Sequence, residues 1–514
     1  MVGRSNTPEP LLARKAVYGL AALSFVGHVA TALVTPYSIH RDELLYLAMG
    51  KYLAFWRMDF PPLIALLANS TRWLFGDSLA AIRLLPAVAG ALLVILSALM
   101  ARELGGKGRA QVLTSLAVLL NPLFLRAGAL FQPTVFDQLW WTGGLYCFLR
   151  LLKSDHAKWW ILLGVAGGFG LLTKFSIAFF GIGVLAGILL THHRNSLLTP
   201  RPYVAMAIAL TIGSPSIIGQ IQLDFPVLAQ LQVLQEVQLS RVTPISFLFV
   251  QLLVLGPAVI LAGLGIWWLI WARAARQFRA IGWACLTSFV AVLALQGKPY
   301  YVGPLYPILL AAGAVAIGMF DHKVQRIAGI VLMTLILAYG VVTLPLGLPI
   351  VPPEPMARYS VALGASEART SNTGEVLSLP QDYADMVEWE DQVSLVARVY
   401  HTLPADKKAK AVIMARNYGE AGAIDFFGPR HGLPRAVCVS GSYWFFGPGQ
   451  LPGEVVVSIG LRPDDVQGLF RSVEIVGHAD NRWTVPEERN IPVMVCESPR
   501  QSLQELWPRF KGIN

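Results

Sequence analysis

Charged residues are scarce in this chain of 514 residues. Asp, Glu, Lys and Arg make up 14% of it, against about 25% in soluble domains. This deficit excludes an ordinary soluble enzyme. The formal net charge of +10 does not indicate a nucleic-acid partner or a disordered chain, because the cations are not gathered in basic runs. Hydrophobic residues are abundant instead, at 55%, as expected of a polytopic membrane protein.

Cysteine is also rare, with four residues in the whole chain. Their spacing excludes a disulfide framework and a CxxC metal site. Cys438 and Cys496 fall in a segment that we expect outside the cytoplasm, where they form either a disulfide or two free thiols. The sequence offers no cluster of His and Cys, so no cofactor is predicted. A divalent cation on paired carboxylates is the open alternative.

Acidic residues are few in the first two thirds of the chain. Residues 1–346 contain 25 Lys and Arg but 11 Asp and Glu, whereas residues 347–514 contain 16 and 20. The sequence therefore predicts an α-helical transmembrane domain over 1–346 and an extracytoplasmic α/β domain over 347–514. In the second domain, hydrophobic patterns predict strands at 411–414, 455–459, 473–476 and 493–496 and helices at 382–400, 420–426 and 502–510.

Apolar runs of about 20 residues indicate helices that cross a bilayer. The segment 159–191 is too long for one crossing, and we divide it at Lys174, its one charged residue. Eleven spans are then predicted, at 16–36, 81–101, 110–125, 135–152, 159–173, 175–191, 203–222, 246–271, 280–296, 304–320 and 327–346.

The loop charges orient these spans. Sixteen of the 25 cations in residues 1–346, from Arg4 to Arg326, fall on one side, which the positive-inside rule makes cytoplasmic. The N-terminus lies on that side. Because eleven is odd, the domain over 347–514 lies outside, in the periplasm of a bacterial inner membrane or its equivalent.

The first outer loop, residues 37–80, contains two adjacent carboxylates, Asp42 and Glu43, that follow an arginine. Such neighbours repel each other unless a cation or a hydrogen bond compensates. One interpretation is that one carboxylate is a general base and the other its electrostatic partner. The other is that both simply begin a helix, since acidic side chains stabilise helix N-termini. Farther along the loop, Pro61 and Pro62 predict the start of an amphipathic helix along the membrane surface.

Ionisable residues at the outer ends of the spans are further candidates, because charges at membrane depth are costly and usually line a polar cavity. Lys174 interrupts an apolar run and is either a ligand for an anion or a lysine that snorkels to the interface. Asp137 is either a cavity acid or a helix-capping acid. Lys298 and Tyr301 share a Tyr-rich segment that suits sugar stacking and equally suits an aromatic belt.

Short motifs follow one another along nearly the whole chain. They are Asp42-Glu43, DFPPLIAL at 59–66, LFGD at 74–77, RLLPA at 83–87, ARELGG at 101–106, Phe136-Asp137, GLLTK at 170–174, GKPYYVGPLYP at 297–307 and NYGEAGA at 417–423. In the order and spacing of these motifs the sequence resembles the GT-C membrane glycosyltransferases. Within them it is similar to the branch that contains protein O-mannosyltransferases, the lipid A aminoarabinose transferase and rhizobial galacturonosyltransferases.

This resemblance implies an enzyme that takes a sugar from a polyprenyl-phosphate donor. The acceptor is a lipid, a polysaccharide or a protein of the envelope, and transfer takes place at the outer face, usually with inversion. The resemblance also implies that Asp42 is the essential acid, with Glu43 beside it. Lys174 then lies near the donor phosphate, and Asp137 faces the same cavity.

The sequence departs from the family at one position, since many relatives carry His or Lys where this chain has Phe60. Three arginines are candidates to replace that contact: Arg41, Arg57 and Arg83. The residues support this chemistry independently of the family resemblance, because a phosphate that leaves an anomeric carbon needs cations near its oxygens. Lys174 and Lys298, on predicted outer turns, are the first candidates for this role, and Arg83 is the next.

The alternative function is a transporter or flippase of a lipid-linked or anionic sugar. Transporters often show internal repeats and broken helices near the membrane midplane. This sequence shows no repeat, and its charged groups gather toward one face. A sensor with an outer ligand-binding domain would leave the acidic pair and Lys174 unexplained. We therefore predict a glycosyltransferase whose partners are the lipid-linked donor, the acceptor and the bilayer, and no nucleic acid.

Overall fold

The computed structural model describes residues 10–511, so Arg4 lies outside the described residues. The chain forms two compact units. The helical unit comprises the chain up to Val34 together with Arg83–Ile217 and Leu234–Leu348. The mixed unit comprises Thr35–Ile82, Ile218–Val233 and Pro349–Asn514. The first predicted outer loop and the C-terminal segment therefore belong to one compact unit, although hundreds of residues separate them in the sequence.

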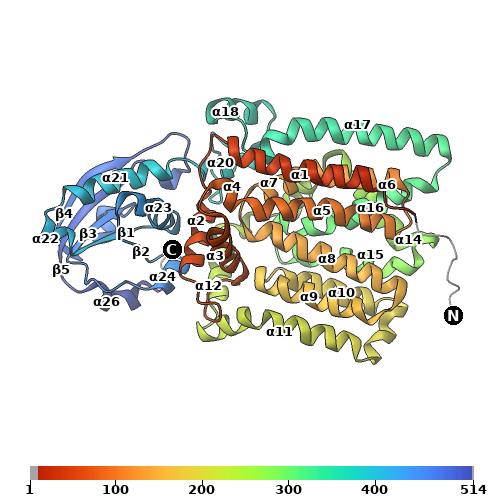
Figure 1. The fold of residues 1–514 in the computed structure, drawn as a ribbon, viewed down its shortest axis with the longest axis horizontal. Helices are drawn as coiled ribbons and strands as arrows, with labels where there is room; N and C mark the ends of the chain where they lie inside the picture. Colours follow the sequence, from red (N-terminus) through yellow and green to blue (C-terminus); the bar gives the residue numbers. More distant parts are fainter. Residues whose placement is uncertain (1–9, 512–514) are drawn as a thin grey trace. The chain divides into compact units, whose positions relative to one another are not determined.

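Long helices that run side by side make up the helical unit (Figure 1). They are α1 (Arg14–Val34), α5 (Leu84–Glu103), α6 (Gly108–Leu119), α7 (Pro122–Ala129), α8 (Pro133–Ser154), α9 (Ala157–Thr173), α10 (Ile177–Leu189), α11 (Arg201–Gln222), α13 (Pro244–Leu255), α14 (Val259–Trp271), α15 (Arg279–Ala294), α16 (Tyr306–Ala316) and α17 (His322–Gly347). Short 3-10 segments connect them: η1 (His192–Leu198), η3 (Gly256–Ala258), η4 (Arg273–Phe278), η5 (Pro299–Leu305) and η6 (Ile317–Met319). Helix α11 ends in residues of the mixed unit, which includes Ile218–Val233.

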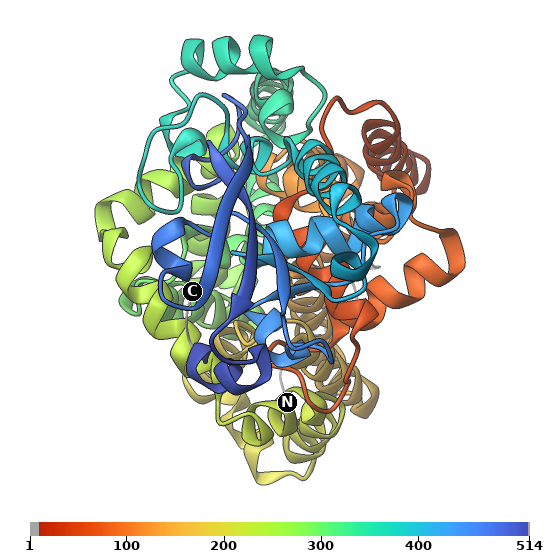
Figure 2. The same ribbon diagram turned by 90° about the vertical axis from the view of Figure 1, so that its left-hand side faces the viewer.

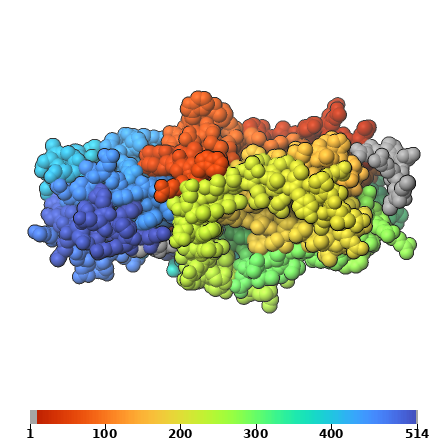
Figure 3. Space-filling model, turned by 90° about the horizontal axis from the view of Figure 1, so that it is seen from below, coloured from red at the N-terminus to blue at the C-terminus, as the bar shows by residue number. Residues whose placement is uncertain are grey.

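The outer helices of this unit expose large apolar side chains. Figure 3 shows the face covered by α9 to α11, in orange-yellow to yellow-green. Ile161, Leu185 and Leu210 on these helices are 45%, 49% and 47% exposed. Helices that keep apolar residues on their exposed surface need an apolar solvent, which the bilayer provides.

Within residues 10–511, seven helices are long and apolar enough to cross a membrane, or nine if each of two bent pairs counts as one span. Each of the eleven predicted spans coincides with helical structure, but the predicted count of eleven is not confirmed. The predicted break at Lys174 is present, since α9 ends at Thr173 and Lys174 has extended backbone dihedrals. Gly170 makes room for this turn, because a Cβ there would lie 2.5 Å from Ile177.

A five-stranded sheet with the order β2-β1-β3-β5-β4 forms the centre of the mixed unit (Figure 2). Its strands are β1 (Ala411–Ala415), β2 (Ala436–Cys438), β3 (Val455–Ile459), β4 (Phe470–Ala479) and β5 (Ile491–Pro499). Strand β1 is parallel to β2 and β3, whereas β5 is antiparallel to β3 and β4. All four predicted strands are confirmed, and the three-residue strand β2 is additional.

Helices α21 (Trp389–Thr402) and α23 (Tyr418–Phe427) pack against this sheet and against each other. The shorter helices of the unit are α2 (Arg41–Lys51), α3 (Leu63–Phe75), α4 (Leu79–Ile82), α12 (Pro226–Val237), α18 (Pro353–Ala362), α19 (Ser366–Arg369), α20 (Gln381–Ala384), α22 (Ala405–Lys408), α24 (Ser442–Phe446), α25 (Pro463–Val466) and α26 (Leu503–Leu506). Three 3-10 turns complete it: η7 (Gly428–His431), η8 (Pro486–Glu488) and η9 (Trp507–Phe510). The turn η2 (Leu239–Arg241) lies in the helical unit.

Two details of the mixed unit correct the sequence analysis. The predicted helix over 382–400 is two helices, α20 and α21, because Glu388 between them adopts a φ of 79° that no helix accommodates. The alternative of a disulfide between Cys438 and Cys496 is wrong, and both thiols are free. They lie on β2 and β5, which β1 and β3 separate. Three strand spacings amount to about 14 Å, well beyond the reach of a disulfide.

Candidate functional site

The predicted acidic pair lies in the first turn of α2, where the two carboxylates have different environments. Glu43 is fully buried, and its Oε2 accepts a hydrogen bond from the backbone N–H of His40 at 2.8 Å. The ring Nδ1 of His40 in turn accepts the N–H of Asp42 at 3.0 Å. These reciprocal bonds form a capping box, which satisfies donors that a helix start leaves unpaired. Glu43 therefore stabilises the start of α2, whereas Asp42 stays partly exposed.

Asp42 is held by a residue of the C-terminal segment. The Tyr418 hydroxyl donates a hydrogen bond to Asp42 Oδ1 at 3.0 Å. The Arg41 guanidinium lies 4.8 Å from the centre of the Tyr418 ring, as in a cation–π contact. The carboxylate thus lies next to one cation and accepts one hydroxyl donor. Both contacts fix its orientation without covering it.

The NYGEAGA motif at 417–423 explains how Tyr418 reaches α2. Glycines let α23 approach α2 closely: a Cβ on Gly419 would lie 2.8 Å from Arg41 Cγ, and a Cβ on Gly422 would lie 2.8 Å from Leu44 Cβ. Asn417 accepts hydrogen bonds from the first turn of α23 and so begins the helix at the required place. The motif is a docking surface for α2.

More charged groups surround this acid. His40 Nε2 lies 3.6 Å from Asp382 Oδ1 and 4.0 Å from Asp385 Oδ2. The Asp385 backbone carbonyl accepts the N–H of Arg41 at 2.9 Å. Burial lowers the pKa of His40, but the carboxylates of Asp382, Asp42 and Asp385 outweigh this effect and raise it. The group thus combines three carboxylates, those of Asp42, Asp382 and Asp385, with the basic side chains of His40 and Arg41.

Asp385 should make the stability of the mixed unit depend on pH. Burial raises its pKa to about 6, although His40 and Arg41 act in the opposite direction. The folded carboxyl therefore keeps its proton where the unfolded one, with a pKa of 3.8, has lost it. Stability falls as pH rises from about 4 to 6, by about 2–3 kcal/mol from this group. Thermal unfolding of the purified chain between pH 4 and 7 should show this loss for wild type and a smaller one for Asp385→Asn. Identical profiles would contradict the prediction.

A second group of predicted residues lies in the helical unit, around the break between α9 and α10. The Lys174 Nζ lies 4.1 Å from the ring centre of Tyr301 and 4.9 Å from that of Tyr300. Asp137 in the first turns of α8 is buried and interacts electrostatically with Lys174. Its Oδ2 accepts the Ser176 hydroxyl at 2.9 Å. Lys174, Asp137 and Tyr301, predicted from separate motifs, are thus brought together.

The two remaining candidates are also in the helical unit. Lys298 precedes η5, and its backbone carbonyl accepts the N–H of Tyr301 at 3.0 Å. Arg83 precedes α5 and is 3% exposed. The seven candidates therefore divide between the units: Asp42 and Glu43 belong to the mixed unit, and the other five to the helical unit.

Sequence reasoning missed most partners of Asp42. Tyr418 stood within a motif that had been recognised, but only the packing of α23 on α2 shows its contact. His40 lies two residues before Asp42, and this proximity was a signal available in the sequence. Asp382 and Asp385 gave no signal, since they lie in a predicted helix that the structure breaks. Within residues 10–511, no group of three or more His, Cys, Asp or Glu has the geometry of a metal site.

Residues 59–218 match the model of the family described as dolichyl-phosphate-mannose-protein mannosyltransferase. No curated protein matches the chain in sequence. Among solved structures, ArnT from Cupriavidus metallidurans is similar in its apo state, with a TM-score of 0.63 and 18% identity over 94% of this chain and 98% of that chain. The same enzyme bound to undecaprenyl phosphate matches with a TM-score of 0.59 and 16% identity over the same shares.

A more distant likeness is to the archaeal oligosaccharyltransferase AglB from Archaeoglobus fulgidus, in complex with an inhibitory peptide and a dolichol-phosphate. Its TM-score is 0.50 at 14% identity, over 87% of this chain and 69% of that chain. At such identities the likeness to solved structures shows a shared fold, and the family match adds sequence evidence for about a third of the chain. The resemblance predicted from the motifs is confirmed as similarity: residues 59–218 match the family of dolichyl-phosphate-mannose-protein mannosyltransferases in sequence, and the chain shares the fold of ArnT.

Proposed function

We propose that the protein transfers a sugar from a polyprenyl-phosphate-linked donor to an acceptor of the bacterial envelope, at the outer face of the inner membrane and with inversion. The observation that carries this proposal is the Lys174 group, a cation within 5 Å of two tyrosine rings and next to a buried carboxylate. It occurs in a fold shared with ArnT, one structure of which holds undecaprenyl phosphate.

The donor side of the reaction falls to the helical unit. As the bond between the anomeric carbon and the phosphate oxygen breaks, negative charge grows on the phosphate, and a fixed cation stabilises it. The Lys174 ammonium supplies this charge, and Asp137 and the two tyrosines hold it in place. Lys298 and Arg83 are the proposed additional phosphate contacts, and Tyr301 offers a ring for the sugar.

The acceptor side falls to Asp42 in the mixed unit. An acceptor hydroxyl attacks the anomeric carbon, its proton passes to the Asp42 carboxylate, and polyprenyl phosphate leaves. Asp42 is the partly exposed member of the pair, oriented by Tyr418 and Arg41. For Glu43, whose carboxylate is buried in the capping box, we propose the role of positioning Asp42. An acceptor that is itself a phosphate would need only positioning.

A transfer assay tests the proposal against the transporter alternative. The purified full chain is reconstituted into vesicles with a radiolabelled polyprenyl-phosphate sugar and an extract of envelope lipids, polysaccharides and proteins. Label that moves onto an acceptor supports a transferase. Label that crosses the bilayer and stays on its lipid would contradict the proposal and favour a flippase. Mass spectrometry of envelope glycolipids from a deletion strain then identifies the sugar and the acceptor.

Loss of the Lys174 charge should weaken the donor step. We expect Lys174→Met to lower kcat/KM for the donor about 10- to 100-fold, the range of one charge-assisted contact to a phosphate. Lys174→Arg should keep most of the activity. Lys158→Met is a matched control, because the Lys158 Nζ also lies over an aromatic ring, 5.0 Å from the centre of Trp159, but outside this group. Equal losses in Lys158→Met and Lys174→Met would exclude a specific role for Lys174.

A further inference from the structure

A polar cavity lies at the far end of α10 from Lys174. Its volume is about 400 Å³. It is lined by Leu190, Thr191, His192, His193, Arg194, Arg276, Arg279, Ala280 and Trp283. Three arginines and two histidines thus line it, and none of the lining residues is acidic. Since α10 has 13 residues, about 20 Å of helix separates the cavity from Lys174.

Close helix packing brings these residues together. A Cβ on Gly187 of α10 would lie 2.2 Å from the Ala280 carbonyl oxygen of α15, and a Cβ on Gly183 would lie 2.5 Å from that of Ala284. The end of α10 therefore lies against the start of α15. Arg194 in η1 and Arg276 in η4 follow and precede these packed ends. The packed helix ends therefore fix one side of the cavity, and the connecting segments with Thr191–Arg194 and Arg276 form the rest.

The arginines of this cavity form no ion pair with any described residue. Among residues 10–511, no carboxylate lies within 4.0 Å of the guanidinium groups of Arg194, Arg276 or Arg279. Arg279 Nε and His193 Nε2 are buried and accept or donate no hydrogen bond in the described part of the chain. The nearest acid that acts on His193 is Asp155, and its carboxylate pairs with Arg201 at 2.9 Å.

We propose that this cavity binds a phosphate group. Guanidinium groups pair with phosphate oxygens in a bidentate fashion, and the three arginines carry enough positive charge to neutralise one phosphate of charge −1 or −2. The first turn of α15 adds the positive end of a helix dipole. Trp283 is typical of the membrane interface. The loop charges predict that this end of the helices is cytoplasmic, so the site is distinct from the proposed donor site and extends beyond the proposed function.

Two sources supply a phosphate there: the headgroup of an anionic phospholipid of the inner leaflet, or a soluble phosphate of the cytoplasm. Native mass spectrometry of the full chain in detergent, titrated with phosphatidylglycerol or phosphatidylcholine, measures the lipid arm. Calorimetric titration with inorganic phosphate or glycerol phosphate measures the soluble arm. We expect wild type to bind the phosphate-bearing ligand of at least one arm, with phosphatidylglycerol preferred to phosphatidylcholine in the lipid arm.

The double variant Arg276→Gln/Arg279→Gln should weaken that binding about 100-fold or more, the loss expected for two charge-assisted contacts. The matched control is Arg273→Gln, because Arg273 lies in the same η4 but does not line the cavity. Arg276→Lys/Arg279→Lys keeps the charge, and retained binding by it would show that the fold tolerates changes here. The proposal is overturned if wild type binds in neither arm, or if Arg273→Gln weakens binding as much as the double variant. Sugar transfer by the same proteins is measured in parallel. Its loss or retention tests the proposed function and not the phosphate site.

Discussion

Asp42→Asn should lower kcat of sugar transfer by about 10²- to 10⁴-fold, the contribution of a positioned general base. Asn keeps the size of Asp and an oxygen that accepts the Tyr418 hydroxyl, which donates to Asp42 at 3.0 Å. The Asp42→Asn protein should therefore keep its fold but lose the group that accepts the proton. Single-turnover measurements with radiolabelled donor separate the transfer step from donor binding, and we expect the donor affinity to change little.

Two neighbouring variants make this result specific. Tyr418→Phe removes the donor to Asp42 but leaves the ring under Arg41, so we expect a loss of activity smaller than that of Asp42→Asn. Glu43→Gln weakens the capping box and should lower the free energy of unfolding by about 1 kcal/mol. Its effect on kcat should be smaller than that of Asp42→Asn. If Glu43→Gln abolished transfer in a folded protein while Asp42→Asn remained active, the roles of the two carboxylates would be reversed.

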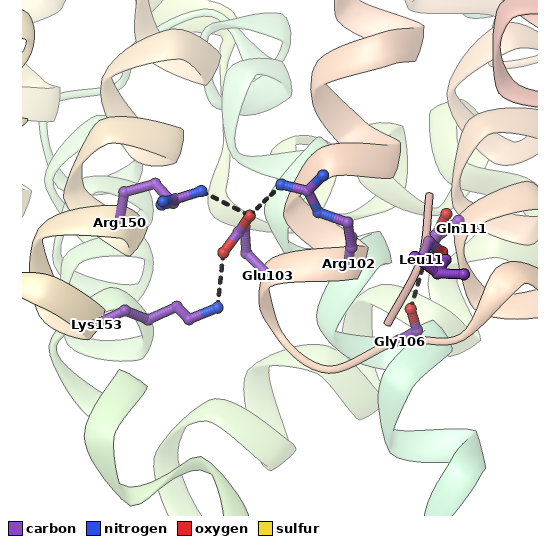
Figure 4. A network of polar contacts seen from close by, with 7 residues as sticks. All are labelled: Leu11, Arg102, Glu103, Gly106, Gln111, Arg150 and Lys153. Atoms are coloured by element: carbon purple, nitrogen blue, oxygen red, sulfur yellow. Dashed lines mark hydrogen bonds and ion pairs between the residues drawn. The ribbon is translucent and has the colours of Figure 1, made fainter. Parts of the chain in front are cut away.

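Glu103→Gln should destabilise the helical unit by about 3 kcal/mol. Figure 4 shows the Glu103 carboxylate between three cations. Arg102 and Arg150 contact its Oε1 at 2.5 and 2.8 Å, and Lys153 contacts Oε2 at 2.6 Å. The carboxylate is fully buried, whereas the cations are 20–25% exposed. Removal of the one anion leaves three cations close together, and their residual hydration places the loss at the lower end of the range for broken buried pairs.

Unfolding of the purified chain in mixed micelles with increasing SDS measures this loss. Asp155→Asn is a suitable control in the same unit, because Asp155 also pairs with an arginine but its side chain is 71% exposed. Its loss should stay below about 1 kcal/mol. A Glu103→Gln protein as stable as Asp155→Asn would show that the cations repel each other little once the carboxylate is gone.

The sequence predicted elements better than contacts. Apolar runs and alternating patterns located the helices of the membrane domain and four of the five strands, because burial leaves a local periodic signal. The strand Ala436–Cys438 was missed since three residues are too short for a period. The break at Glu388 was missed because a left-handed residue other than glycine or asparagine gives no warning. The predicted count of eleven membrane spans was not confirmed, because each of two bent helix pairs can be counted as one crossing or as none.

The candidate site shows the same division. Asp42, Lys174 and Asp137 stood out because each is an ionisable residue in an apolar or motif-rich context. The surroundings of Asp42 were not predictable in this way, since Tyr418 is 376 residues away and Asp385 more than 340. Local patterns carry no information on which distant segments pack together. The contact between Lys174 and Tyr301 was closer to being predictable, because both residues lie at helix ends that the predicted spans had already located.

The pairing of Asp42 with Tyr418 has a consequence for biosynthesis. The acid leaves the ribosome 376 residues before its hydroxyl partner. The first loop must therefore wait, with the α2 surface around Leu44 uncovered, until α23 has been made. A chain released before Tyr418 would therefore carry its apolar helices but lack the hydroxyl that orients Asp42.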